Sequence, residues 1–247
     1  MGLVKDEAIV TRKLSYGESD RIVHLFTLNS GKISAIAKGG AKSVKRFMNT
    51  LEPMQIINVE YFDKSFKGHL SRIESAHIVE DMSGIERDFQ RFSLASFFIE
   101  VADRLTKERQ PFPTLFHLLS GILRRLKTSS VPLPEVLMLL LKILETIGFL
   151  PNFKSCVHCG KTVEQKIYFS SEKGGILCER CTQFCPSEVY PDQLLNFLAT
   201  GKKELSDQLI SFAFDLLESF IKFHLDVELR TFKFIKPKDG SLGIGLK

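Results

Sequence analysis

The sequence predicts an α+β protein with more than one domain. Residues 1 to about 80 contain short segments rich in β-branched and aromatic residues, separated by turn-forming residues. From residue 87 the apolar residues recur at helical spacing instead. All five cysteines lie between residues 156 and 185, so a compact cysteine segment interrupts the helical part. A length of 247 residues fits one large domain or two to three small ones.

Five strands are predicted in the first part of the chain. They are residues 8–10, 21–26, 32–37, 56–62 and 69–79. Turn chemistry separates them, at residues 16–20, 29–31, 39–40 and 67–68. Because no helical pattern intervenes, we expect a small antiparallel barrel or sandwich. The five-stranded oligonucleotide-binding (OB) barrel is one such fold.

The second part predicts a helical bundle. Helices are expected at residues 87–105, from Pro113 to Leu126, from Glu135 to Ile147, and again from near Pro191, with a strong segment at 206–225. Gly148 is placed to end the third helix, whose sides are mostly apolar, so we expect that helix at the centre of the bundle. Phe212, Phe214 and Phe220 are expected in the core.

The cysteines give the most specific chemical signal. Cys156 and Cys159 form one CxxC pair, Cys178 and Cys181 form another, and 18 residues separate the pairs. This spacing is typical of two knuckles that share one Zn²⁺, because each tight turn places two thiolates on one side of the ion. Such a closed site has no vacancy for a reacting water. We expect a structural zinc ion here rather than a redox pair or unliganded thiols.

Two neighbours of these cysteines offer alternative ligands. His158 lies inside the first knuckle, where its side chain is expected to point outward. Cys185 is the odd cysteine, and it is a weaker candidate to replace Cys181 because the CxxC spacing fixes the bite better.

A basic segment gives the second signal. The chain carries no acid between residue 32 and Glu52, and its cations there are Lys32, Lys38, Lys42, Lys45 and Arg46. Glycines and cations in one loop suit contact with a phosphate backbone, although a charge run is usually a solvated face. Phe47, Tyr61 and Phe62 are candidates for base stacking, with core packing expected for at least two of them. A weaker basic stretch comprises Arg230, Lys233, Lys236 and Lys238.

Composition sets the remaining limits. A net charge of +5 and a pI near 8.9 permit nucleic-acid binding without requiring it. The sequence has no GxxxxGK[ST] loop, GxSxG elbow or HExxH motif, which disfavours an enzyme. The first residues do not resemble a signal peptide, and the longest apolar run, 136–141, is too short to cross a bilayer. We therefore expect a cytoplasmic protein.

Three stretches of the chain carry a family resemblance. They are residues 31–40 with Lys42, Lys45, Arg46 and residues 51–53; residues 141–151 leading into 156–160; and residues 171–178. Together they resemble the bacterial RecO family of recombination mediators, in the same order and over nearly the whole chain. The resemblance implies an OB-fold DNA-binding domain at 1–80 and a helical domain at 81–247, interrupted by a zinc module at about 152–188. Gly40, Ser43 and Thr231 depart from the family pattern, which bears on the strength of DNA binding.

The resemblance also implies a function. Members bind single- and double-stranded DNA without catalysing a reaction, anneal complementary strands, and act with RecR and sometimes RecF. They help to load RecA onto DNA coated by single-strand-binding protein, whose acidic C-terminal tail they contact, which implies a nucleoid-associated location. The alternatives are a helical adaptor whose DNA affinity is incidental, and a nucleic-acid enzyme with an accessory zinc ribbon.

Overall fold

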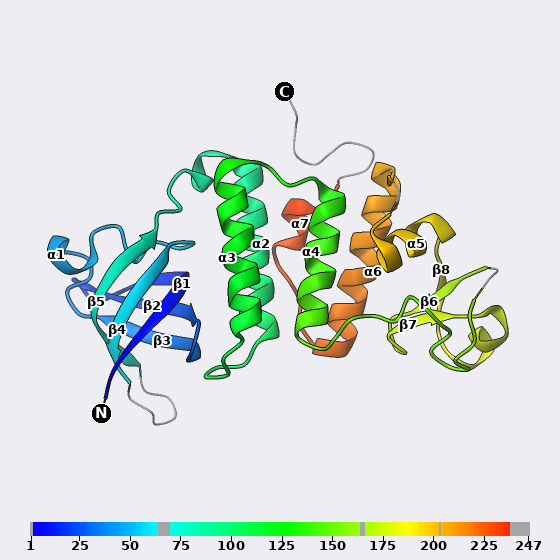
Figure 1. Cartoon of the computed structure of the whole chain (residues 1–247), viewed down its shortest axis with the longest axis horizontal. Coiled ribbons are helices and arrows are strands. Elements are labelled where there is room, and N and C mark those ends of the chain that lie inside the picture. The colour runs from blue at the N-terminus through cyan, green and yellow to red at the C-terminus, as the bar shows by residue number, and fades with distance from the viewer. Residues whose placement is uncertain (1, 64–69, 164–165, 203, 238–247) are drawn as a thin grey trace. The chain divides into compact units, whose positions relative to one another are not determined.

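The computed structural model describes residues 2–63, 70–163, 166–202 and 204–237, and only the backbone of Val44 and Lys45. The chain divides into two compact units, Met1–Ser130 and Val131–Lys247. The first unit contains, in chain order, β1 (Leu3–Tyr16), β2 (Asp20–Thr27), β3 (Gly31–Ala37), α1 (Val44–Phe47), β4 (Ile56–Phe62), β5 (Ser71–Glu80), the 3-10 turn η1 (Ile85–Arg87), α2 (Phe89–Leu105) and α3 (Pro113–Thr128) (Figure 1). The second contains α4 (Leu133–Thr146), β6 (Tyr168–Ser170), β7 (Gly175–Leu177), the 3-10 turn η2 (Glu179–Phe184), β8 (Glu188–Val189), α5 (Asp192–Thr200), α6 (Asp207–Leu225) and α7 (Phe232–Ile235).

The first five strands form a closed barrel in the order β1-β2-β3-β5-β4. Neighbouring strands are antiparallel except β3 and β5, which run parallel. This is the OB-fold barrel, so the predicted fold class is confirmed and the sandwich alternative is excluded. The predicted strands correspond to β1–β5, although His69 and the predicted turn at Lys67-Gly68 lie outside the described residues.

Strand β1 is much longer than the three apolar residues that signalled it. Its first half pairs with β4, from Leu3 opposite Phe62 onward, and its second half pairs with β2 as far as Tyr16 opposite Asp20. The register shifts between Val10 and Arg12, and such a bulge bends a strand from one neighbour to the next. The ends of the strand carry charged residues such as Lys5, Glu7 and Lys13, so apolar pattern alone could not reveal the full length.

Alternate strand residues fill the barrel interior, as the pleat of a strand requires. Val10, Leu25, Ile57 and Val59 are fully buried there. The short helix α1 lies against β5 and buries Phe47 in the same core. The sequence reading treated this segment as loop, because four residues are too few to show a helical period.

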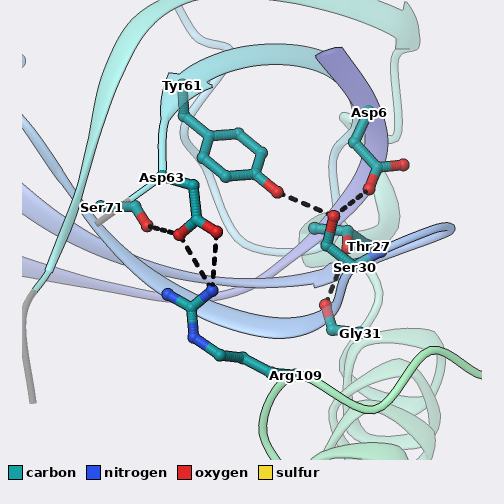
Figure 2. A network of polar contacts seen from close by, with 8 residues as sticks. All are labelled: Asp6, Thr27, Ser30, Gly31, Tyr61, Asp63, Ser71 and Arg109. Carbon is teal, nitrogen blue, oxygen red and sulfur yellow. Dashed lines mark hydrogen bonds and ion pairs between the residues drawn. The ribbon is translucent and has the colours of Figure 1, made fainter. Parts of the chain in front are cut away.

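A polar network fixes the turn between β2 and β3 to the barrel (Figure 2). Asp6 on β1 is buried and accepts hydrogen bonds from Ser30 Oγ at 2.9 Å and from the backbone N–H of Asn29 at 3.1 Å. Ser30 Oγ in turn accepts a hydrogen bond from Tyr61 Oη at 2.8 Å. Burial raises the pKa of Tyr61, which keeps its phenol protonated as a donor.

The connection between α2 and α3 returns to this part of the barrel. The backbone N–H of Arg109 donates to Lys32 O at 3.0 Å, and Arg109 Nη1 lies 2.9 Å from an oxygen of Asp63 (Figure 2). Gly31 adopts a positive φ of 70°, and a Cβ added there would lie 2.4 Å from Gln110 O. The helical hairpin is therefore fixed directly to the barrel within the first unit.

In the second unit, α4 packs against α5 and α6. Leu137, Leu140 and Leu144 of α4 are completely buried, whereas Lys142 is exposed. Gly148 follows with a φ of 82°, confirming the predicted end of the helix. Phe212 of α6 is 37% exposed, so its assignment to the core was wrong; Phe214 and Phe220 are buried as expected.

The cysteine segment contains a small three-stranded sheet in the order β7-β6-β8, which the sequence reading missed because its strands have only two or three residues. Gly174 has a φ of 73°, as a tight turn requires. A Cβ on Gly175 would lie 2.5 Å from Asn152 O, because the chain entering the module runs beside β7. Within the described ranges, no helix is long and apolar enough to span a membrane.

Candidate metal centre and nucleic-acid interface

The structure brings together the four cysteines of the two CxxC pairs. All four sulfur atoms lie within 4.8 Å of one another, and Cys159 Sγ is 3.9 Å from Cys178 Sγ. Each pair is closed by a tight turn: Gly160 N–H donates to Cys156 O at 2.8 Å, and Cys181 N–H donates to Cys178 O at 2.9 Å. Within the described ranges this is the one group of three or more His, Cys, Asp or Glu side chains close enough to hold a metal ion.

The geometry of these thiols fits a metal ion. Zn–S bonds of about 2.3 Å in a tetrahedron place the sulfurs about 3.8 Å apart, close to the separation of Cys159 and Cys178. Burial opposes ionisation of Cys156, but backbone N–H groups of Cys159, Cys178 and His158 outweigh it and lower its pKa to about 6. Burial and the neighbouring thiols raise the pKa of Cys181 to about 12. Four thiolates so close together need a cation to neutralise them, which a divalent metal supplies.

Neither alternative ligand lies in this group. The ring of His158 is exposed and stacks on Phe184, with ring centroids 5.1 Å apart and planes 12° from parallel. Cys185 is buried and packs in the small apolar cluster beside Cys156 and Leu177, but is not among the four clustered sulfurs.

The basic segment after β3 is a folded turn held by the turn between β1 and β2. The carboxylate of Asp20 accepts a hydrogen bond from Gly39 N–H at 2.8 Å, and Ala41 N–H donates to Ser19 O at 2.8 Å. Gly40 packs closely enough that an added Cβ would lie 2.9 Å from Ala37 O. Gly40 is therefore required by close packing, whereas Gly39 is favoured by its positive φ of 68°.

Four of the five predicted cations lie on this turn or directly after it. Lys38 and Lys42 are exposed, and among the described residues their ammonium groups have no partner. Arg46 is exposed, donates to Lys38 O at 2.8 Å and lies 4.9 Å from the ring centroid of Phe47. The side chain of Lys45 lies outside the described part of the structure.

Lys32 is separated from the others. Its side chain is 17% exposed, and its amine donates to Asp103 O on α2 and lies 3.5 Å from the Asp103 carboxylate. Two cations that the sequence reading missed, Lys13 and Arg21, instead line a depression of about 270 Å³ together with Lys42. Their place depends on the pairing of β1, β2 and β3, which a local charge pattern does not reveal.

The other candidate binding residues have structural partners. Phe47 and Tyr61 are buried, as expected for at least two of the three aromatics, and Phe62 is half-buried with the Arg72 guanidinium 5.0 Å from its ring centroid. In the C-terminal basic stretch, Lys236 forms an ion pair with Asp215. Lys233 lies 5.0 Å from the ring centroid of Phe234, and Lys238 lies outside the described residues.

The fold and the cysteine cluster define a class: an OB-fold protein with a helical part and a four-cysteine module that could hold a metal ion. The family model described as "Recombination protein O N terminal" matches residues 1–82, and that described as "Recombination protein O C terminal" matches residues 86–231. The chain belongs to the RecO family of DNA repair proteins.

Similar proteins come from diverse bacteria and share the name DNA repair protein RecO. The Geobacter metallireducens protein is 35% identical, with 96% of this chain and 98% of the relative covered. The Myxococcus xanthus protein is 32% identical, covering 93% and 96%, and the Thermoanaerobacter sp. (strain X514) protein is 30% identical, covering 95% and 98%. The likeness extends over both compact units.

Proposed function

We propose that this protein is a non-enzymatic recombination mediator. It binds single- and double-stranded DNA, anneals complementary strands and, with RecR and in some settings RecF, helps to load RecA onto DNA coated by single-strand-binding protein. Membership of the family supports this role at the level of DNA repair. The observation that carries the DNA-binding part is the turn after β3, which holds exposed cations on a rigid barrel.

The physical basis is electrostatic. Lys38 and Lys42 have no acidic partner among the described residues, so no internal ion pair has to break when a phosphate binds. A turn fixed by Asp20 and Ser19 loses little conformational freedom on binding. Cations that contact phosphates bind without reading sequence and release counterions. The proposed contacts are Lys38, Lys42, Arg46 and Lys45, and they leave out Lys32.

The test reverses three charges together, in a Lys38→Glu, Lys42→Glu, Arg46→Glu variant. Affinity for a labelled single strand should fall at least tenfold. The slope of log K against log salt should become shallower by about 2, because each of the three lost phosphate contacts contributes about 0.7 to it. Titrations at several salt concentrations measure both quantities.

A matched control reverses Arg87, Arg104 and Lys107, which are exposed cations of the same unit. Both triple variants change the formal net charge from +5 to −1, so a general charge effect would appear equally in each. Equal loss of affinity in the two variants, or no loss in the first, would contradict the assignment to this turn.

For the cysteine site we propose a single structural Zn²⁺ bound by Cys156, Cys159, Cys178 and Cys181. The all-sulfur ligand set favours Zn²⁺ over Mg²⁺ or Ca²⁺, which prefer oxygen. Four protein ligands complete the tetrahedron, so the ion stabilises the module without activating water.

We also propose a place for the acidic tail of single-strand-binding protein. A pocket of about 460 Å³ lies in the second unit between α4, the chain at 150–155 and α5. Its lining includes Leu141, Leu150 and Leu198. Lys142, Lys154 and Glu145 also line it, and Glu145 pairs with Lys142 at 2.7 Å. An apolar pocket whose charged lining residues leave one net positive charge suits a peptide that combines acidic and apolar residues.

This pocket also favours the second candidate function, a protein-interaction adaptor with only incidental DNA affinity. DNA titrations at two salt concentrations separate the two functions. A mediator should bind DNA with a steep salt dependence that the triple variant weakens, whereas an adaptor should bind the acidic peptide and only trace amounts of DNA.

A further inference from the structure

The depression beside the basic turn, the segment 38–46 after β3, is lined by both charged and apolar residues. It is lined by Lys13, Arg21 and Lys42, by the single carboxylate of Glu52, and by the segment that follows α1. Lys13 and Glu52 neutralise each other, because both carboxylate oxygens of Glu52 accept hydrogen bonds from Lys13 Nζ, so the net positive charge comes from Arg21 and Lys42. The depression therefore keeps a net attraction for an anion.

The segment after α1 presents an apolar and an amide side chain at the same place. Met48 lines the depression and is 59% exposed, so its thioether is accessible to a ligand there. Asn49, also exposed, has a φ of 54°, a conformation that Asn tolerates better than most residues. Its amide offers both a donor and an acceptor.

The size of the depression limits what it can take. At about 270 Å³ it lies just below the usual range for pockets that hold drug-sized molecules, so it fits one planar ring system with its substituents. A polarizable methionine packs well on the face of an aromatic ring without selecting among such rings. Cations at the rim place a phosphodiester next to that ring. One nucleobase attached to its backbone has all of these properties.

We propose that this depression, formed by Lys13, Arg21, Lys42, Met48 and Asn49, takes a single unpaired nucleobase and makes the barrel prefer single-stranded over duplex DNA. The inference rests on the proposed DNA binding by the basic turn and adds a source of strand selectivity to it. A single strand presents an unstacked base at little cost, whereas a duplex must first break a base pair and unstack the base. Phosphate contacts alone would not make this distinction.

The experiment compares three labelled probes of equal length on the full chain: a thymidine homopolymer, a single strand of abasic sites and a blunt duplex. Wild-type protein should bind the homopolymer about tenfold more tightly than the abasic strand, as expected for stacking of one base. In a Met48→Ser variant this ratio should fall towards one, while affinities for the abasic strand and the duplex stay unchanged. The control is Leu3→Ser, which changes an exposed apolar residue at the start of β1, at the other end of this strand from Lys13. This variant should keep the wild-type ratio.

The outcomes separate this proposal from the proposed function. Equal wild-type affinity for homopolymer and abasic strand, or a Met48→Ser variant that keeps the wild-type ratio, would overturn the base site while leaving phosphate binding intact. A Met48→Ser variant that weakens all three probes equally would also overturn it. The Lys38→Glu, Lys42→Glu, Arg46→Glu variant should weaken all three probes, and failure of the wild type to bind any of them would overturn the proposed function itself.

Discussion

Gly31 is where the barrel and the α2–α3 connection come closest. Its φ of 70° is costly for any other residue, and the backbone of Gln110 occupies the space a side chain would need. Two independent causes therefore require glycine here. The sequence shows only an Asn-Ser-Gly turn between two strands, because the second cause comes from a segment about 80 residues away.

A pair of substitutions separates these causes. Gly31→Ala should lower the free energy of unfolding by about 3 kcal/mol, because alanine is strained at this positive φ and the backbone of Gln110 must also move away from the new Cβ. Gly17→Ala, at a φ of 59° with nothing within 4 Å, should cost only about 1 kcal/mol of conformational strain. Urea denaturation measures both values. Equal losses would mean that the close approach to Gln110 contributes nothing.

The lowered pKa of Asp81 predicts that the free energy of unfolding decreases at acid pH. Hydrogen bonds from Ser83 and from the Gln55 side chain lower the pKa of Asp81 to about 2. A carboxylate with a lowered pKa stabilises the folded state fully above its ordinary value of 3.8, and this contribution is lost as the pH falls through about 2.

Asp81→Asn should therefore be less stable than wild type at neutral pH, and the difference should shrink as the pH approaches 2. Denaturation midpoints of both proteins across this range give the comparison. A difference that is constant with pH would show that ionisation of Asp81 does not contribute. Because the carboxylate is solvent-exposed, we expect a modest effect.

At the scale of elements, the cysteine module has a small apolar core, so we expect the proposed metal to supply much of its stability. Its strands have two or three residues, and its apolar cluster includes Cys156, Cys181 and Cys185 themselves. Elements this short do not fold by their own pairing. The CxxC spacing could therefore be read from sequence, whereas the three strands that it organises could not.

Substitution of two cysteines tests this dependence. Cys178→Ser should reduce bound zinc from about one ion per chain to near zero and destabilise the module, because one thiolate of the tetrahedron is lost. Cys185→Ser should keep the metal, since its sulfur lies outside the cluster. Elemental analysis of purified protein measures the metal content. If Cys185→Ser lost zinc and Cys178→Ser kept it, Cys185 rather than Cys178 would be a ligand.

Other elements show the same division between local and distant causes. Residues 56–62 were predicted at the bounds of β4, because burial of the alternate residues Ile57, Val59 and Tyr61 gives the strand a local apolar pattern. The ends of β1 were missed because their role is set by partners on β2 and β4. Tertiary contacts also divide the five predicted phosphate contacts, because Lys32 pairs with Asp103 and lies apart from the other four. Lys13 and Arg21, which the charge pattern did not indicate, line the same depression as Lys42.

For the whole molecule, the two proposed binding sites belong to different compact units. The basic turn lies in Met1–Ser130, and the 460 Å³ pocket lies in Val131–Lys247. In the proposed mediator, DNA and the tail of a protein bound to DNA would then be held by separate units and would not compete for one surface. The modest net charge of +5 agrees with local basic patches rather than a uniformly basic surface.

This separation predicts that the two activities can be removed independently in the full chain. Lys142→Glu with Lys154→Glu should weaken binding of the acidic tail peptide of single-strand-binding protein about tenfold or more, because the charged residues that line the pocket change from a net +1, with Glu145 included, to −3. DNA affinity should stay within about twofold of wild type, as expected for sites that share no partners. Lys38→Glu, Lys42→Glu, Arg46→Glu should show the reverse pattern. Fluorescence anisotropy with labelled peptide and labelled strand measures both activities on each variant, and a variant of either kind that loses both would place the two ligands on one shared surface.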